Sequence, residues 1–164
     1  MGTRMEFQAA SEPEMEAFGA RMARGLAPGL VIHLGGPLGA GKTTLVRGLL
    51  RALGWAGAVK SPTYTLVETY LLGDILIHHF DLYRLSDPEE LEFIGLRDYL
   101  DGHAICLIEW AERGGSLLPE PDLRVEIAFR DGGRVMGGAP GTEAGSRLLD
   151  GIRADTIDAP SRAT

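Results

Sequence analysis

The spacing of hydrophobic and polar residues predicts alternating strands and helices in the first part of the chain. Apolar residues recur every three or four positions from Met15 to Leu26, which is typical of a helix, and Ser11 with Glu14 forms a capping box in front of them. Short apolar runs without helical spacing are suited to buried strands. The pattern predicts, in chain order, a strand over residues 3–10, a helix ending near residue 26, a strand over residues 30–34 and a helix over residues 43–54.

The remaining pattern predicts two hairpins, a further buried strand and two more helices. Gly73 and Asp74 separate two strand-like runs, which is typical of a hairpin turn. Asp87, followed by Pro88 and two glutamates, is typical of the beginning of a helix. The predicted elements are a hairpin over residues 60–85, one helix over residues 87–100, a strand over residues 104–110, a hairpin over residues 122–138 and a helix over residues 146–155, with the last few residues frayed.

The overall composition is that of a globular protein. The 164 residues are 45% hydrophobic and 24% charged, which favours one domain with a sizeable core. No apolar run is long enough for a membrane span, so we expect no membrane segment and a cytoplasmic location. The single cysteine, Cys106, lies in an apolar run, and we interpret it as a buried hydrophobic residue rather than a nucleophile.

A glycine-rich stretch follows the strand predicted over residues 30–34. It contains the pattern Gly-x-x-x-x-Gly-Lys-Thr from Gly36 to Thr43, and it leads into the next predicted helix. Such a loop exposes backbone N–H groups, and the positive end of the helix dipole adds to their attraction for phosphate. We therefore predict a nucleotide-phosphate site in which Lys42 neutralises the phosphates and Thr43 ligates Mg²⁺. The predicted nucleotide-binding residues of this loop are Gly36, Leu38, Gly39, Ala40, Gly41, Lys42, Thr43 and Thr44.

The absence of asparagine bears on which nucleotide is bound, and two acidic residues at strand ends are candidates for the catalytic groups. The chain has no asparagine, which the guanine-reading element of Ras-type GTPases requires, so ATP is favoured by elimination. Asp81 and Glu109 each end an apolar run, as the acid of a Walker B element does. Both are therefore candidates for binding Mg²⁺ and for orienting the attacking water. For each acid the alternative is a solvated carboxylate at the end of an ordinary strand.

Three hydroxyl residues form a candidate switch. Ser61, Thr63 and Thr65 follow the glycine loop at the distance where P-loop NTPases often have a segment that senses the γ-phosphate. The alternative is an ordinary strand entry, in which Thr and Tyr are favoured. His78 and His79 are adjacent and therefore point to opposite faces of a strand, so they cannot share one metal ion, and we interpret both as packing residues.

These features predict the fold class and the domain organisation. We expect an α/β protein, a three-layer sandwich of the P-loop NTPase type with a mixed central sheet flanked by helices. Residues 1–137 form the expected P-loop ATPase domain. Residues 138–164 form a C-terminal helix or tail, which either belongs to the same domain or is partly disordered.

Several stretches together resemble one family. "GPLGAGKTT", "SPTYTLVE", "FDLYRL" and "CLIEWAERG" occur in the order and spacing of TsaE (also called YjeE), the bacterial ATPase needed to make threonylcarbamoyladenosine in tRNA. The resemblance covers roughly residues 5–129, and it is specific, since the glycine loop alone would indicate only the superfamily. The segment after Val135 resembles nothing in the family, and Pro37 stands where some members have an aspartate.

The resemblance implies roles for individual residues and for partner proteins. It implies ATP and Mg²⁺ as ligands, Asp81 as essential for hydrolysis, and Glu109 with Thr43 at the Mg²⁺ site. The implied catalytic set is thus Lys42, Asp81 and Glu109, with Trp110 close to the nucleotide and residues 61–65 as the switch. TsaE works with TsaD and TsaB, which carry the transfer chemistry, while TsaC makes the threonylcarbamoyl-adenylate. ATP hydrolysis is expected to be weak without those partners.

Two other functions remain open from the residues alone. One is a P-loop small-molecule kinase, although no insertion is large enough for an arginine-bearing lid, and Arg84 and Arg113 are the only arginines near the predicted site. The other is a nucleotide-sensing docking module that does not hydrolyse. A net charge of −7 indicates that contacts with tRNA are made mainly through partners. The sequence does not determine the oligomeric state.

Overall fold

The structure is a computed structural model that describes residues 5–158. Residues 1–4, which include the beginning of the first predicted strand, and residues 159–164, expected to be frayed, lie outside the described residues. No helix among the described residues is both long enough and apolar enough to cross a membrane.

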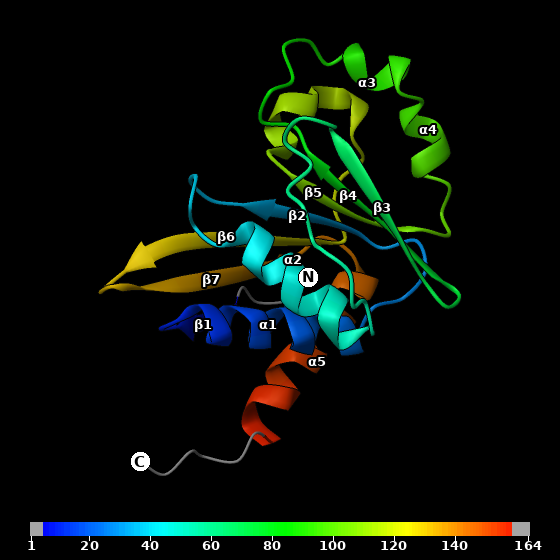
Figure 1. Ribbon diagram of the computed structural model, residues 1–164. Helices are drawn as coiled ribbons and strands as arrows, with labels where there is room; N and C mark the ends of the chain where they lie inside the picture. Colours follow the sequence, from blue (N-terminus) through cyan, green and yellow to red (C-terminus); the bar gives the residue numbers. More distant parts are fainter. Residues whose placement is uncertain (1–4, 159–164) are drawn as a thin grey trace.

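A seven-stranded mixed sheet forms the middle layer, in the order β1-β7-β6-β2-β5-β4-β3 (Figure 1). The neighbours β6, β2, β5 and β4 are parallel, and the outer pairs β1–β7, β7–β6 and β4–β3 are antiparallel. Both predicted hairpins are present, and the mixed α/β sheet is confirmed. The strands are β1 (Met5–Ala9), β2 (Val31–Gly35), β3 (Val67–Leu72), β4 (Ile75–Asp81), β5 (Ile105–Glu109), β6 (Leu123–Arg130) and β7 (Gly133–Pro140).

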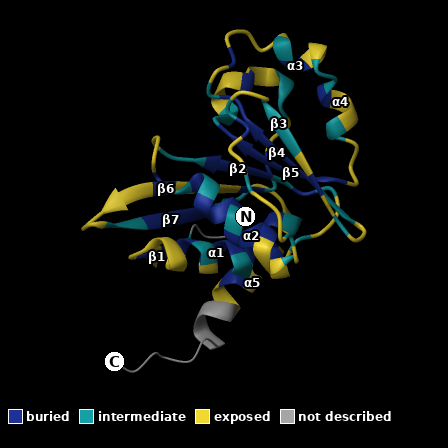
Figure 2. Ribbon diagram, in the orientation of Figure 1, coloured by how far each residue is buried: buried dark blue, intermediate teal, exposed yellow. Residues whose placement is uncertain are grey.

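Helices cover both faces of the sheet, and each face has its own hydrophobic cluster. The larger cluster joins α1 (Glu12–Arg24), α2 (Lys42–Ala52) and α5 (Glu143–Asp158) to the sheet. The smaller one joins the other face of β4 and β5 to α3 (Glu90–Phe93), α4 (Leu96–Tyr99) and the 3₁₀ segment η1 (Ala111–Leu117). Figure 2 shows the central strands buried between these layers. The expected three-layer sandwich is confirmed.

Two glycines set the distance between α1 and α2, and thereby the position of the glycine loop. A Cβ atom at Gly19 would lie 2.1 Å from the backbone oxygen of Leu45, and one at Gly48 would lie 2.1 Å from that of Glu16. Any side chain at either position would therefore push the two helices apart. Because α2 begins at the end of the glycine loop, this close packing fixes the loop against α1.

The prediction of one continuous helix over residues 87–100 is wrong. Asp87 Oδ1 accepts from the N–H of Glu89 at 2.9 Å, but α3 begins only at Glu90, with Glu89 as its N-cap and no side-chain cap, so the predicted cap at Asp87 is also wrong. The chain then forms two short helices, α3 and α4, separated at Gly95, whose φ of 78° is left-handed. A left-handed residue ends the i to i−4 hydrogen-bond series, so the amphipathic pattern continues while the helix does not.

The C-terminal helix predicted over residues 146–155 is present as the longer α5. It buries Leu148, Leu149 and Ile152 in the larger hydrophobic cluster and packs against α1, β6 and β7. The helix thus completes the layer that also contains α2.

Candidate functional site

The glycine loop connects β2 to α2 in a conformation that requires glycine. Gly36, Gly39 and Gly41 have φ values of 139°, 77° and 109°, which L side chains rarely adopt. Gly41 is the N-cap of α2, and no side chain caps the helix there. The first N–H groups of α2 therefore remain available to an anion, as the sequence pattern predicted.

Lys42 lies at the base of this loop and is only 5% exposed. Its Nζ donates to the backbone oxygen of Gly36 at 2.5 Å and lies 4.1 Å from the centre of the Trp110 ring. Burial lowers the pKa of Lys42, while the negative charges of Glu109 and Asp81 oppose that shift. The ammonium thus contacts an aromatic face and a backbone carbonyl, and the negative charges of two carboxylates act on it.

One cavity of about 330 Å³ unites most of the predicted site residues. They come from the glycine loop, from the segment before β3 and from the ends of β4 and β5. The cavity also includes Glu12, at the start of α1, which the sequence did not indicate. Its lining residues are Glu12, Leu38, Gly39, Ala40, Gly41, Lys42, Thr43, Thr44, Ser61, Thr63, Asp81, Glu109 and Trp110.

The carboxylate of Asp81 is hydrogen-bonded to two hydroxyls of the candidate switch. Its Oδ2 accepts from Thr63 Oγ1 at 2.9 Å and from Ser61 Oγ at 3.4 Å, and the two hydroxyls lie 2.7 Å apart. Its Oδ1 accepts from the backbone N–H of Tyr83 at 3.0 Å. Because Asp81 is only 5% exposed, these donors compensate for the loss of water around its charge. A movement of the switch would therefore change the environment of this carboxylate directly.

Thr65 lies apart from the other two hydroxyls. Its Oγ1 donates to Glu68 Oε1 at 3.1 Å, it is exposed, and it does not line the cavity. The backbone turns between Thr63 and Thr65, where Leu66 N–H donates to Pro62 O at 2.8 Å. Two of the three predicted switch hydroxyls thus reach the site.

A buried histidine at the site was missed by the interpretation of both histidines as packing residues. His79 Nε2 lies 2.6 Å from Glu109 Oε2, whereas His78 Nδ1 bonds the Thr69 hydroxyl at 2.8 Å. The two rings do point to opposite faces of β4, as predicted, but His79 is more than a packing residue. The sequence signal was its position two residues before Asp81, which places both side chains on one face of the strand.

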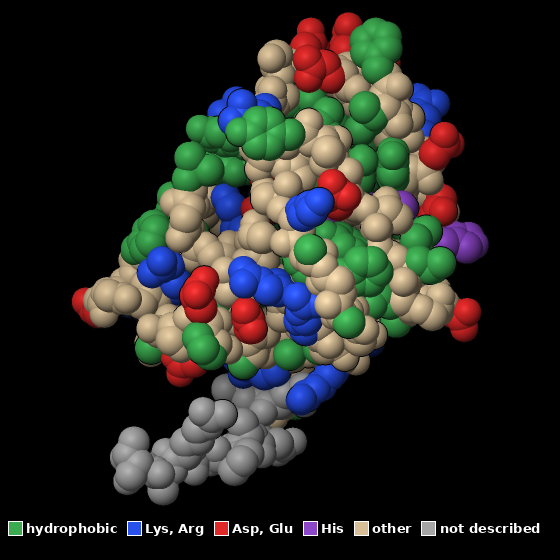
Figure 3. Space-filling view, viewed as in Figure 1, with side chains coloured by type: hydrophobic (Ala, Val, Ile, Leu, Met, Phe, Trp, Pro, Cys, Tyr) green, Lys and Arg blue, Asp and Glu red, His purple; other side chains and the backbone are tan. Residues whose placement is uncertain are grey.

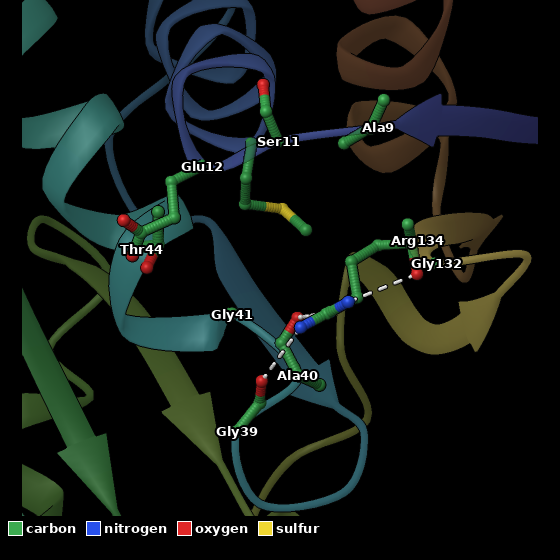
Figure 4. Close-up of a pocket in the computed structure, with 12 residues that line it drawn as sticks. Ala9, Ser11, Glu12, Gly39, Ala40, Gly41, Thr44, Gly132 and Arg134 are labelled. Carbon is green, nitrogen blue, oxygen red and sulfur yellow. Dashed lines mark hydrogen bonds between the residues drawn. The ribbon is translucent and has the colours of Figure 1, made fainter.

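A second cavity of about 240 Å³ adjoins the loop on its other side (Figure 4). Arg134 lies beside it, donating from Nε to Ala40 O at 3.0 Å and from its terminal nitrogens to Gly39 O at 3.4 Å and Gly133 O at 3.1 Å. Glu12 lines both cavities. Nothing in the local sequence indicated Arg134, because its bonds to Ala40 and Gly39 reach across 94 and 95 residues of chain.

The donor set of the first cavity fits a magnesium nucleotide better than a metal held by protein alone. Within the part of the chain that the structure describes, no group of three or more His, Cys, Asp or Glu side chains is arranged to hold a metal. Among the residues that line the cavity, Thr43 supplies a hydroxyl at the end of the glycine loop, and Asp81 and Glu109 supply buried carboxylates. Mg²⁺ is commonly bound by one or two carboxylates together with substrate phosphates and water, so these residues suit it.

Cys106 lies in β5 and is buried, as the sequence indicated. Burial raises the pKa of its thiol to about 12. Its Sγ donates to Tyr99 O at 3.5 Å, on the face of the sheet away from the cavity. A thiol with such a raised pKa is protonated at neutral pH, which agrees with the interpretation of Cys106 as a buried hydrophobic residue.

This fold and this loop define a P-loop nucleotide-binding protein. The sequence model of the family described as "Threonylcarbamoyl adenosine biosynthesis protein TsaE" matches residues 9–136. The chain therefore belongs to the TsaE family, as its motifs indicated.

Comparison with individual proteins supports the same family. The chain is 52% identical over 120 residues to the tRNA threonylcarbamoyladenosine biosynthesis protein TsaE of Haemophilus influenzae, covering 73% of this chain and 76% of that one. It is 37% identical over 123 residues to the TsaE of Bacillus subtilis, covering 75% and 77%. The crystal structure of YdiB from Bacillus subtilis superposes with a TM-score of 0.81 at 27% identity, over 95% of this chain and 98% of that one.

Proposed function

We propose that the chain binds ATP with Mg²⁺ at the glycine loop and hydrolyses it to ADP and phosphate. In this way it supports the threonylcarbamoyladenosine modification of tRNA. The observation that carries the proposal is a single cavity in which a phosphate-binding loop, its buried lysine and two buried strand-end carboxylates meet. Family membership supports the place in threonylcarbamoyladenosine synthesis.

Each residue has a role that its chemistry suits. The N–H groups of the loop and the Lys42 ammonium bind the phosphates, and Thr43 with Glu109 would hold Mg²⁺. The metal ion supplies neutralisation of the charge that develops on the phosphates. We assign to Asp81 the orientation of the attacking water, because its carboxylate oxygens only accept hydrogen bonds and line the same cavity.

The second cavity provides room for the adenosine part of the nucleotide. It lies on the side of the loop away from Asp81 and Glu109, which line only the first cavity. A nucleotide with its terminal phosphate toward those carboxylates would extend its base in this direction. Arg134 fixes that side of the loop through its bonds to Gly39 O and Ala40 O.

ATP should bind more tightly than GTP, by at least about tenfold, because the chain has no asparagine with which to build the usual guanine-reading element. Isothermal titration calorimetry with the two nucleotides in the presence of Mg²⁺ measures the difference. Equal dissociation constants would refute the assignment of ATP.

Thr63→Ala should lower the rate of ATP hydrolysis by about tenfold while changing ATP affinity much less, since the variant removes a hydrogen bond to the Asp81 carboxylate. The measurement is phosphate release at saturating ATP alongside calorimetry. Thr65→Ala is the matched control, because its hydroxyl bonds Glu68 and does not line the cavity. A Thr65→Ala variant as impaired as Thr63→Ala would show that the loss comes from a general disturbance of the segment.

The proposed partners are TsaB and TsaD, with tRNA contacted mainly through them. The net charge of −7 supports this division of labour. On the face shown in Figure 3, basic and acidic side chains are interspersed, and the described residues there form no continuous basic stripe. A pull-down with purified TsaB and TsaD in ATP and in ADP tests the association. Capture that depends on the nucleotide is expected, and no capture in either nucleotide would contradict it.

A further inference from the structure

A buried pair of polar side chains joins β4 to β5 beneath the candidate nucleotide cavity. His79 is 0% exposed and Glu109 is 2% exposed, and His79 Nε2 lies 2.6 Å from Glu109 Oε2. At this distance the imidazole nitrogen and the carboxylate oxygen share one hydrogen bond. The other ring nitrogen, Nδ1, is buried and has no hydrogen-bond partner in the described part of the chain.

The strand register places His79 and Glu109 on the same face of the sheet as Asp81. Glu109 lies directly opposite Asp81 in the parallel β4–β5 pair, and His79 precedes Asp81 by two residues. All three side chains therefore project from the same face of the sheet, the one covered by α2. The imidazole is placed below the cavity, and the two carboxylates form the cavity wall.

The pairing needs an explanation beyond packing. The neighbouring sheet positions on this face, Ile77 and Leu107, are apolar and fully buried. An imidazole among them, with one nitrogen unpaired, is costly compared with an apolar side chain of similar size. What the histidine adds is one defined bond to one oxygen of Glu109.

We propose that His79 is a positioning residue that holds Glu109 in the orientation required for Mg²⁺. This inference rests on the proposed Mg²⁺–nucleotide function. With Oε2 held by the imidazole, the carboxylate cannot rotate freely, and Oε1 is the oxygen left for a cation in the cavity. Partners of this kind, one shell behind a metal ligand, commonly change metal affinity by 10- to 100-fold when removed.

The test measures the dependence of ADP binding on Mg²⁺. The ratio of the ADP dissociation constants in EDTA and in Mg²⁺, obtained by calorimetry, gives the coupling without requiring catalysis. His79→Leu should reduce this ratio by about tenfold and leave the EDTA affinity unchanged. His78→Leu is the matched control on the opposite face of the same strand, and it should retain the wild-type ratio. A wild-type ratio in His79→Leu, or an equal loss in both variants, would overturn the proposal.

A double-mutant cycle separates positioning from general destabilisation. If His79 acts through Glu109, then Glu109→Ala combined with His79→Leu should give the same coupling ratio as Glu109→Ala alone. The combined variant removes both polar partners together, which avoids leaving either one buried and unpaired. A further tenfold loss in the combined variant would overturn the proposal.

A conservative variant keeps the test decisive if His79→Leu does not fold. His79→Gln retains a side-chain N–H at a similar reach, so its coupling ratio should stay within about threefold of wild type. A folded His79→Gln variant that loses as much coupling as Glu109→Ala would overturn the proposal. If the wild-type protein bound ADP with the same dissociation constant in EDTA and in Mg²⁺, the result would contradict the proposed function, and the inference with it.

Discussion

Lys42→Ala is expected to lower ATP affinity by about a hundredfold. The lysine is nearly buried and lies where the glycine loop meets α2, so we expect its ammonium to interact with phosphate in a site with little water. Charge-assisted hydrogen bonds contribute about 1.5–3 kcal/mol, and the upper part of this range corresponds to roughly a hundredfold in affinity. Calorimetric titration of ATP in Mg²⁺ measures the loss.

Lys60→Ala is the matched control for this experiment. Lys60 is the only other lysine of the chain, and it is exposed and does not line either cavity. Its substitution should leave ATP affinity within about twofold, since an exposed charge contributes little. Circular dichroism of both variants verifies that the fold is retained. Unchanged ATP binding in a folded Lys42→Ala variant would contradict the assignment of the site.

Asp81→Ala and Glu109→Ala are expected to separate binding from hydrolysis. Phosphate binding depends mainly on the loop, so the nucleotide should still bind, while the hydrolysis rate falls by about a hundredfold or more. Glu109→Ala should also weaken the dependence on Mg²⁺, because this carboxylate is the proposed metal ligand. The measurements are phosphate release at saturating ATP and calorimetric binding of ADP.

Two controls sharpen the interpretation of these variants. Asp74→Ala removes an exposed carboxylate at the tip of the β3–β4 hairpin and should hydrolyse ATP at the wild-type rate. Glu109→Gln keeps a polar partner for His79 and tests whether the loss in Glu109→Ala arises from an unpaired imidazole. If Asp81→Ala and Glu109→Ala both hydrolysed ATP at the wild-type rate, neither strand end would be catalytic.

The parts of the fold that depend on short-range patterns could be predicted from the sequence. The glycine loop, the helix behind it and the hairpin turn at Gly73–Asp74 each have a local signature, and each is present. The break at Gly95 could not be predicted with the same certainty, because a single glycine inside an amphipathic run is also tolerated in a helix.

The parts of the site that depend on long-range contacts were not predictable. His79 meets Glu109 across 30 residues of chain, and Arg134 meets Ala40 across 94 residues. Neither contact can be predicted until the register of the strands that carry these residues is known. The separation of Thr65 from Thr63 likewise depends on a turn whose geometry the local sequence does not specify.

The rate of phosphate release from ATP is the most direct test of the central claim, that this cavity hydrolyses ATP in support of partner proteins. Within the described part of the chain no glutamine lines the first cavity to orient water, so the isolated protein should release phosphate slowly, and addition of TsaB and TsaD should raise the rate. Asp81→Ala should abolish the stimulated rate while still binding ADP. Fast release by the isolated chain, unchanged by TsaB and TsaD or by Asp81→Ala, would contradict the account.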